Sequence, residues 1–122
     1  MKRVLAVLTV LALVVLVSGC TSKPIPPNIE FFNVKIIPPD SEYYSIGTVT
    51  GIIENTGGQT ASYVEIGVKF YDSNDVVVAS GWTNFANVLV GEKREFTISV
   101  LYFPGTYDRY KLHWSLSPGG AM

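Results

Sequence analysis

The sequence has little of the chemistry on which most active sites depend. It contains one cysteine and one histidine in 122 residues, which disfavours zinc or copper sites because they need several nitrogen and sulfur ligands. Its net charge is −1, whereas nucleic-acid binding needs a clustered basic surface. It also has no glycine-rich phosphate loop and no Gly-x-Ser-x-Gly elbow. We therefore predict a protein that is not an enzyme and that uses no cofactor, metal or nucleic acid.

The N-terminus has the charge and hydropathy pattern of a secretory signal. Lys2 and Arg3 are followed by an uncharged apolar run over residues 4–17 and by two small residues before Cys20. A helix formed by that run would reach about 21 Å, which is shorter than the roughly 30 Å hydrocarbon core of a bilayer. A signal peptide is therefore favoured over a permanent membrane span.

The string Val17-Ser18-Gly19-Cys20 resembles the lipobox of prokaryotic lipoproteins. The resemblance implies removal of residues 1–19 and attachment of diacylglycerol to the Cys20 thiol, with fatty acids such as palmitate as the acyl chains. Two buried chains hold a protein stably on a bilayer, so we expect lipidation at Cys20 and a location on the outer face of the cell membrane or in the cell envelope. A secretory peptide cut near Gly19 and an uncleaved anchor are the alternatives.

The segment after Cys20 is rich in proline. Residues 20–28 are expected to form a lipidated tether, because Pro24, Pro26 and Pro27 favour an extended polyproline conformation. At about 3 Å per residue, such a tether would lift the following domain about 25 Å from the lipid.

Residues 29–116 repeat short apolar–polar alternations separated by turn residues. The expected strands cover residues 30–37, 45–55, 61–72, 76–82, 96–100 and 110–116. This spacing predicts an all-β fold, an immunoglobulin-like β-sandwich of six or seven antiparallel strands, with a small barrel as the alternative. The glycine-containing tail at 117–122 lacks periodicity and is expected to be flexible.

The alternation also predicts which side chains face the core. Phe32, Val34 and Ile36 alternate with polar residues and are therefore expected to share one face of their strand. The expected core residues are Val64, Ile66, Val68, Phe70, Trp82 and Trp114. The opposite face of the strand at 61–72 carries Tyr63, Glu65, Lys69 and Tyr71. Gly47 and Gly51 within a predicted strand indicate a bulge or close packing.

Residues 47–100 resemble the FxLYD domain family. The matching strings are Val68-Lys69-Phe70-Tyr71-Asp72, VTGIIENTGGQTASYVEI, the turn Leu89-Val90-Gly91-Glu92 before Phe96, and the closing Tyr110-Lys111-Leu112. This chain departs from the family pattern with Val68 for Phe, Phe70 for Leu and Val90 for Pro. The resemblance implies an immunoglobulin-like sandwich found on secreted and lipid-anchored prokaryotic proteins, mostly of unknown function, and it supplies no catalytic residues.

Exposed tyrosines are the best functional candidates in the sequence. Tyr63 and Tyr71 share a predicted strand face, and Tyr is enriched at interface hot spots, so we take them as a candidate interaction surface for an envelope protein or polysaccharide. His113 is predicted to be a surface strand residue. The run at 72–75 is predicted to be a hairpin turn rather than a calcium loop.

The function expected from these features is a non-enzymatic, lipid-anchored extracytoplasmic domain that acts as a protein-interaction or envelope-binding module. The alternative is a ligand-binding accessory lipoprotein of a transport system, which would need a pocket. An envelope hydrolase would require carboxylates to converge in a cleft; the candidates are Glu54, Glu65, Asp72, Asp75 and Asp108.

Cys20→Ser tests the anchor. Serine lacks the nucleophilic thiolate, so in a bacterium with a lipoprotein pathway the variant should take up no fatty-acid label and should remain unprocessed. Ser22→Ala, two positions beyond, should behave as wild type. An unchanged mature mass and membrane fraction for Cys20→Ser would refute lipidation.

Overall fold

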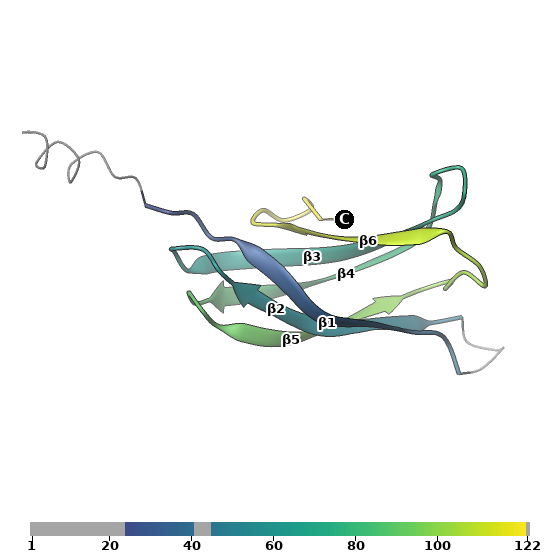
Figure 1. Ribbon diagram of the computed structural model, residues 1–122, viewed down its shortest axis with the longest axis horizontal. Helices are drawn as coiled ribbons and strands as arrows, with labels where there is room; N and C mark the ends of the chain where they lie inside the picture. Colours follow the sequence, from purple (N-terminus) through teal and green to yellow (C-terminus); the bar gives the residue numbers. More distant parts are fainter. Residues whose placement is uncertain (1–23, 41–44, 122) are drawn as a thin grey trace, which may run out of the picture.

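The computed structural model describes residues 24–40 and 45–121, and this part of the chain contains six antiparallel strands and no helix. The strands are β1 (Ile29–Ile37), β2 (Gly47–Asn55), β3 (Ala61–Tyr71), β4 (Val77–Val88), β5 (Lys93–Val100) and β6 (Arg109–Ser115). They form two three-stranded sheets, β1-β2-β5 and β4-β3-β6, that face each other as a sandwich (Figure 1). The all-β prediction is confirmed. The predicted signal peptide and Cys20 lie outside the described residues.

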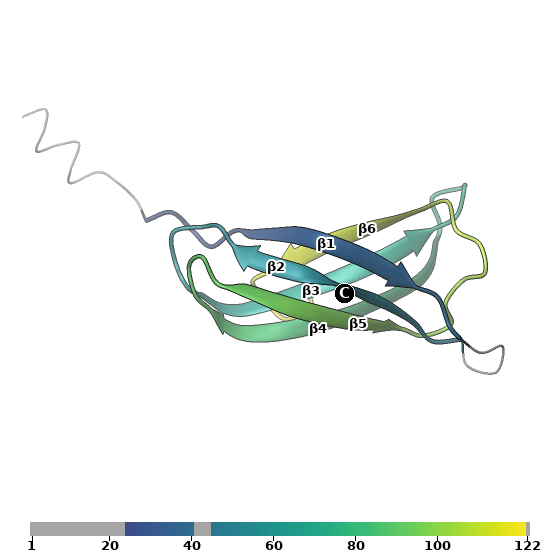
Figure 2. The same ribbon diagram turned by 60° about the horizontal axis from the view of Figure 1, so that its bottom comes forward.

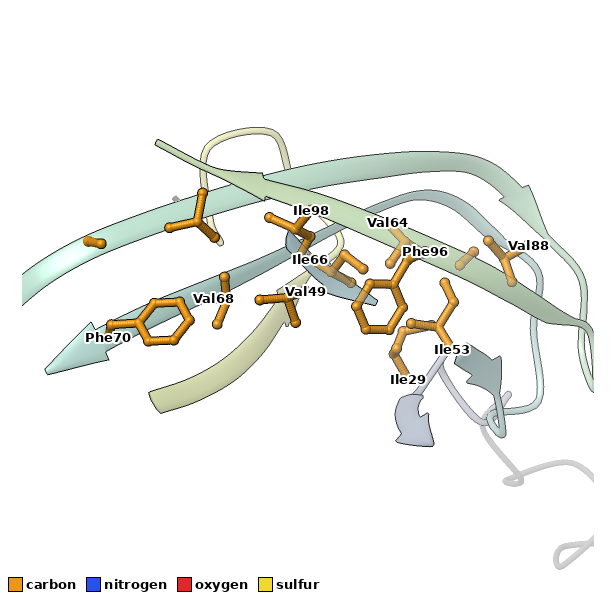
Figure 3. Close-up of a cluster of buried hydrophobic side chains, with 13 residues drawn as sticks. Ile29, Val49, Ile53, Val64, Ile66, Val68, Phe70, Val88, Phe96 and Ile98 are labelled. Atoms are coloured by element: carbon orange, nitrogen blue, oxygen red, sulfur yellow. The ribbon is translucent and has the colours of Figure 1, made fainter. Parts of the chain in front are cut away.

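The core fills the space between the two sheets (Figure 3). The fully buried large apolar side chains are Val49, Ile53, Val64, Ile66, Val68, Phe70, Val88, Ile98 and Val100. They come from alternate positions of β2, β3 and β5 and from the end of β4, as expected for strands with one face packed on a core. The predicted inward face of β3 is therefore confirmed.

A bulge changes the phase of β1. Phe32 pairs with Ile52 and Lys35 pairs with Thr50, so β1 has one extra residue between these pairs. Asn33 takes a left-handed φ of 52° there, as a residue at a bulge can. The prediction that Phe32 shares a face with Val34 and Ile36 is wrong. Before the bulge the inward position belongs to Phe31, and Phe32 is 40% exposed.

The two glycines of β2 mark close packing, as predicted. A Cβ on Gly51 would lie 2.7 Å from the ring of Phe96, the residue paired with it on β5. A Cβ on Gly47 would collide with the ring of Phe103. In both places an aromatic ring occupies the space that a side chain on β2 would need.

The two tryptophans have different environments. Trp114 is partly buried and packs against the core. Trp82 is 44% exposed, so its assignment to the core is wrong. It pairs with Gly67, whose position in β3 alternates with the inward residues Ile66 and Val68. Trp82 therefore lies on the outer face of the β4-β3-β6 sheet.

The two ends of the sandwich carry different loops. Residues 24–28, the β2–β3 loop and the β4–β5 turn lie at one end, which we call the tether end (Figure 2). The β3–β4 turn and the β5–β6 loop lie at the opposite end, which we call the far end (Figure 2). The chain from Cys20 therefore joins the domain at only one of these ends.

A buried amide joins the segments of the tether end. Asn55, the last residue of β2, is fully buried. Its Nδ2 donates hydrogen bonds to the carbonyls of Gln59 (2.8 Å) and Val88 (3.0 Å). Its Oδ1 accepts from the backbone amides of Gly57 (3.0 Å) and Asn28 (3.4 Å). This side chain thus uses its full bonding capacity to connect the tether, the β2–β3 loop and β4.

The last residues of the predicted tether belong to the folded domain. The Thr56 amide donates to the Asn28 carbonyl (2.8 Å), and the Gly58 amide donates to the Pro26 carbonyl (3.3 Å). A Cβ on Gly58 would lie 2.7 Å from the Cβ of Ile25, so the glycine allows the tether to pass close to the loop. The link between Cys20 and the domain is therefore shorter than the sequence alone predicts.

Phe70→Ala should reduce the free energy of unfolding by about 3–5 kcal/mol, because it truncates a fully buried aromatic side chain. Phe32→Ala is the matched control and should cost less than about 1 kcal/mol, since Phe32 lies on the outer face. Urea denaturation of both variants measures the difference. Equal losses would contradict the assigned faces.

Candidate functional site

The two candidate tyrosines lie on the outer face of the β4-β3-β6 sheet, near opposite ends of β3. Tyr63 and Tyr71 are eight positions apart, which corresponds to about 26 Å along a strand. Both side chains are half-buried. The two residues share a face, as the alternation predicts, but they do not form one continuous patch.

The ring of Tyr71 is covered by a cation from the same chain. The Arg109 guanidinium lies 4.1 Å from the ring centroid, a cation–π geometry. Arg109 also binds Asp75 of the β3–β4 turn at 2.8 Å, and this hydrogen bond is the main cause of its raised pKa. Tyr71 therefore contributes to a contact between β6 and the turn.

Tyr63 is bonded to a buried carboxylate. Its hydroxyl donates to Oε2 of Glu65 at 2.7 Å, and the backbone amide of Gly119 donates to the same oxygen at 2.8 Å. Glu65 is only 1% exposed, and its Oε1 has no hydrogen-bond partner among the described residues. The bond from Tyr63 is the largest influence that lowers the pKa of Glu65, and it also raises the pKa of Tyr63.

The C-terminal segment covers this carboxylate. Residues 117–121, for which the sequence predicts flexibility, fold back over β3 (Figure 1). Trp82, Gly67 and His113 lie in one row across the sheet. Nε2 of His113 hydrogen-bonds to the carbonyl of Ala121, and a Cβ on Gly67 would collide with that same carbonyl. The missing side chain of Gly67 thus creates the space in which the tail lies.

Sequence reasoning missed this arrangement. It placed Glu65 on a solvated face and treated His113 as an ordinary surface residue, whereas Glu65 is buried and His113 is half-buried. The available signal was Gly67, since glycine inside a strand often marks a close approach by another backbone. Nothing in the tail itself indicates which residues it contacts.

The other candidate carboxylates lie on the other sheet or at the far end. Glu54 faces Lys93 (3.7 Å) on the β1-β2-β5 sheet, so it does not meet Glu65 on the other sheet. Asp72 forms the predicted turn, because its Oδ1 accepts from the amides of Asn74 (2.8 Å) and Val76 (3.0 Å). Asp108 lies with Asp72 beside a surface hollow of about 270 Å³.

Residues 24–40 and 45–121 contain no cluster of three or more His, Cys, Asp or Glu side chains arranged to hold a metal ion. Over the same residues, no helix has the length and apolar character required to cross a bilayer.

Exposed apolar side chains gather at the far end, where β1 and β5 end and β2 begins. Their exposed fractions are 46% for Ile37, 46% for Ile46, 57% for Leu101 and 82% for Tyr102. The pairs Ile37–Thr48 and Gly47–Val100 bring the ends of β1, β2 and β5 together there. We call these four residues the far-end patch. A gathering of exposed apolar side chains is typical of an interaction site.

The backbone of the patch holds its aromatic residue outward. Tyr102 has a left-handed φ of 53°, which is uncommon for a bulky residue. The next residue, Phe103, points inward and packs on Phe70 with ring centroids 5.3 Å apart. Its amide also donates to the Ser45 carbonyl at 2.7 Å. Tyr102 is therefore fixed in an exposed position rather than left on a loose loop.

A hollow of about 350 Å³ lies beside the patch. Its lining residues are Pro38, Pro39, Asp40, Ser45, Phe103, Pro104 and Gly105. Hot-spot residues of one protein commonly insert into a hollow of the other. The patch and the hollow together make the far end the strongest candidate for a binding surface in the described part of the chain.

Comparisons of this chain with protein-family models, with curated proteins and with solved structures found no match. The FxLYD resemblance and the lipobox therefore stay predictions from the sequence.

Glu65→Gln should change how stability depends on pH. Because the folded pKa of Glu65 is lowered from about 4.5, its ionised form stabilises the domain above that pH, and this contribution is lost as pH falls through the folded pKa. Wild type should therefore lose stability more steeply below about pH 4.5 than Glu65→Gln. Parallel unfolding curves for the two proteins between pH 7 and 3 would contradict the Glu65 contacts.

Proposed function

We propose that this chain is a lipid-anchored, non-enzymatic extracytoplasmic domain that binds another protein of the cell envelope through the far-end patch. The observation that carries the proposal is the position of this patch, at the end of the sandwich opposite to the point where the chain from Cys20 joins it (Figure 2). Such a domain would present its apolar surface away from the membrane that holds it.

The chemistry of the patch favours a protein over a polysaccharide. Three of its four side chains are aliphatic and none is charged. Sugar rings need hydrogen-bonding groups and aromatic platforms, and Tyr102 alone supplies one ring. An apolar protein surface would bury all four side chains, and such anchors commonly dominate binding energy at the centre of an interface.

Two other assignments belong to the same proposal. The immunoglobulin-like type of sandwich rests on the FxLYD resemblance, and the two antiparallel sheets are compatible with it.

The alternative function, an accessory lipoprotein of a transport system, needs a pocket that encloses its ligand. The hollow beside the patch is open to solvent, so it gives that alternative less support.

Photocrosslinking tests the binding surface. A photoreactive phenylalanine analogue at Tyr102, in protein expressed in its own membranes, should form one discrete adduct with another protein. Leu101→Ser in the same chain should abolish that adduct, because it removes an adjacent exposed apolar contact without disturbing the core.

The same analogue at Tyr71 is the matched control. An adduct from position 71 but none from position 102 would move the binding surface to the outer face of β3. The absence of adducts at both positions would contradict a binding role and favour a spacer.

A further inference from the structure

The tether leaves little free chain between the lipid and the domain. Ile25 packs on Gly58, and the Pro26 and Asn28 carbonyls accept hydrogen bonds from the β2–β3 loop. Only five residue steps separate Cys20 from Ile25, which span about 18 Å at full extension. A lipid-anchored domain would therefore hold its tether end within that distance of the bilayer.

The β4–β5 turn at the same end carries two exposed apolar residues. Leu89 is 54% exposed and Val90 is 53% exposed. The turn is connected to the Asn55 site, since the Gly91 amide donates to the Asn55 carbonyl at 2.8 Å. Turns usually carry polar residues, and these two side chains are not needed to form this one.

The turn is held rigidly by polar groups beneath its tip. The Glu92 amide donates to the Leu89 carbonyl at 3.0 Å, and Gly91 supplies the positive φ of 78°, the geometry of a type II turn. The Glu92 carboxylate accepts from the Leu89 amide at 3.1 Å. Arg94 binds that carboxylate and the carbonyls of Ala86 and Asn87. The turn can therefore contact a bilayer without a change in its conformation.

Two ion pairs flank the tip. Arg94 binds Glu92 at 2.9 Å, and Lys93 lies 3.7 Å from Glu54. Glu92 and Arg94 bind each other and hydrogen-bond to the backbone of the turn. This pair therefore contributes little electrostatic attraction to charged lipid headgroups. An apolar tip with paired flanking charges fits the boundary between headgroups and acyl chains better than it fits an anionic surface.

We infer that Leu89 and Val90 insert into the interface of the bilayer that holds Cys20, with Ile25 at the same end of the domain, so that the domain stands with its far end directed outward. This inference rests on the proposed lipid anchor. A weak apolar contact is sufficient here, because the anchor already keeps the tip at high effective concentration near the lipid.

Fluorescence of the lipidated protein tests the inference. Acylation consumes the thiol of Cys20, so Val90→Cys supplies a single labelling site for an environment-sensitive dye. In vesicles of phosphatidylethanolamine and phosphatidylglycerol, the dye should be blue-shifted and quenched by spin-labelled lipid. The same dye on Asn74→Cys, in the far-end turn, should be neither. Leu89→Ser should abolish the shift at position 90.

The other possible results separate failure of the lipid anchor from failure of the docking. If the mass of the protein shows an unacylated Cys20, the proposed anchor fails. If Cys20 is acylated but the dye at position 90 behaves like the dye at position 74, docking fails and the anchor stands. A shift that persists with Leu89→Ser would reflect the dye itself and also overturn docking. A shift that disappears in high salt or without phosphatidylglycerol would replace apolar insertion with headgroup attraction.

Discussion

The arrangement of the tether end depends on the buried side-chain amide of Asn55. This one group bonds to the tether, the β2–β3 loop and the end of β4, and its backbone bonds to the β4–β5 turn. A buried amide without hydrogen-bond partners would destabilise the fold. The native fold therefore requires all of these segments to stay in place around Asn55. As a result, the chain joins the sandwich in a fixed place, and the two ends of the domain become different surfaces.

The polar cluster on the outer face of β3 has a different role. Glu65, Tyr63 and His113 attach the C-terminal tail to the sheet, and Arg109 covers Tyr71 farther along the strand. Tyr63 and Tyr71, the functional candidates from the sequence, thus make contacts inside the domain. Two groups of exposed apolar side chains instead lie at the ends, with Leu101 and Tyr102 at one end and Leu89 and Val90 at the other.

Sequence periodicity was sufficient for the architecture because alternate positions of β2, β3 and β5 face the core. In β3, the positions from Val64 to Phe70 alternate without interruption, and the structure confirms their faces. The pattern failed for Phe32, since one extra residue at the bulge reverses the phase. It also failed for Glu65, which is buried beneath Gly119 of the tail, 54 residues away in the sequence. Alternation describes a strand and its sheet, but it contains no information about a loop that folds over them.

Hydrogen exchange at the Thr56 and Gly58 amides tests most directly whether the tether is part of the domain. In wild type these amides donate to the Asn28 and Pro26 carbonyls, so both should exchange slowly. Asn55→Ala should remove that protection while amides of central β3 stay protected. Rapid exchange at both positions in the wild-type chain would show that the tether is not fixed to the β2–β3 loop, and it would contradict the distinction between the two ends on which the account depends.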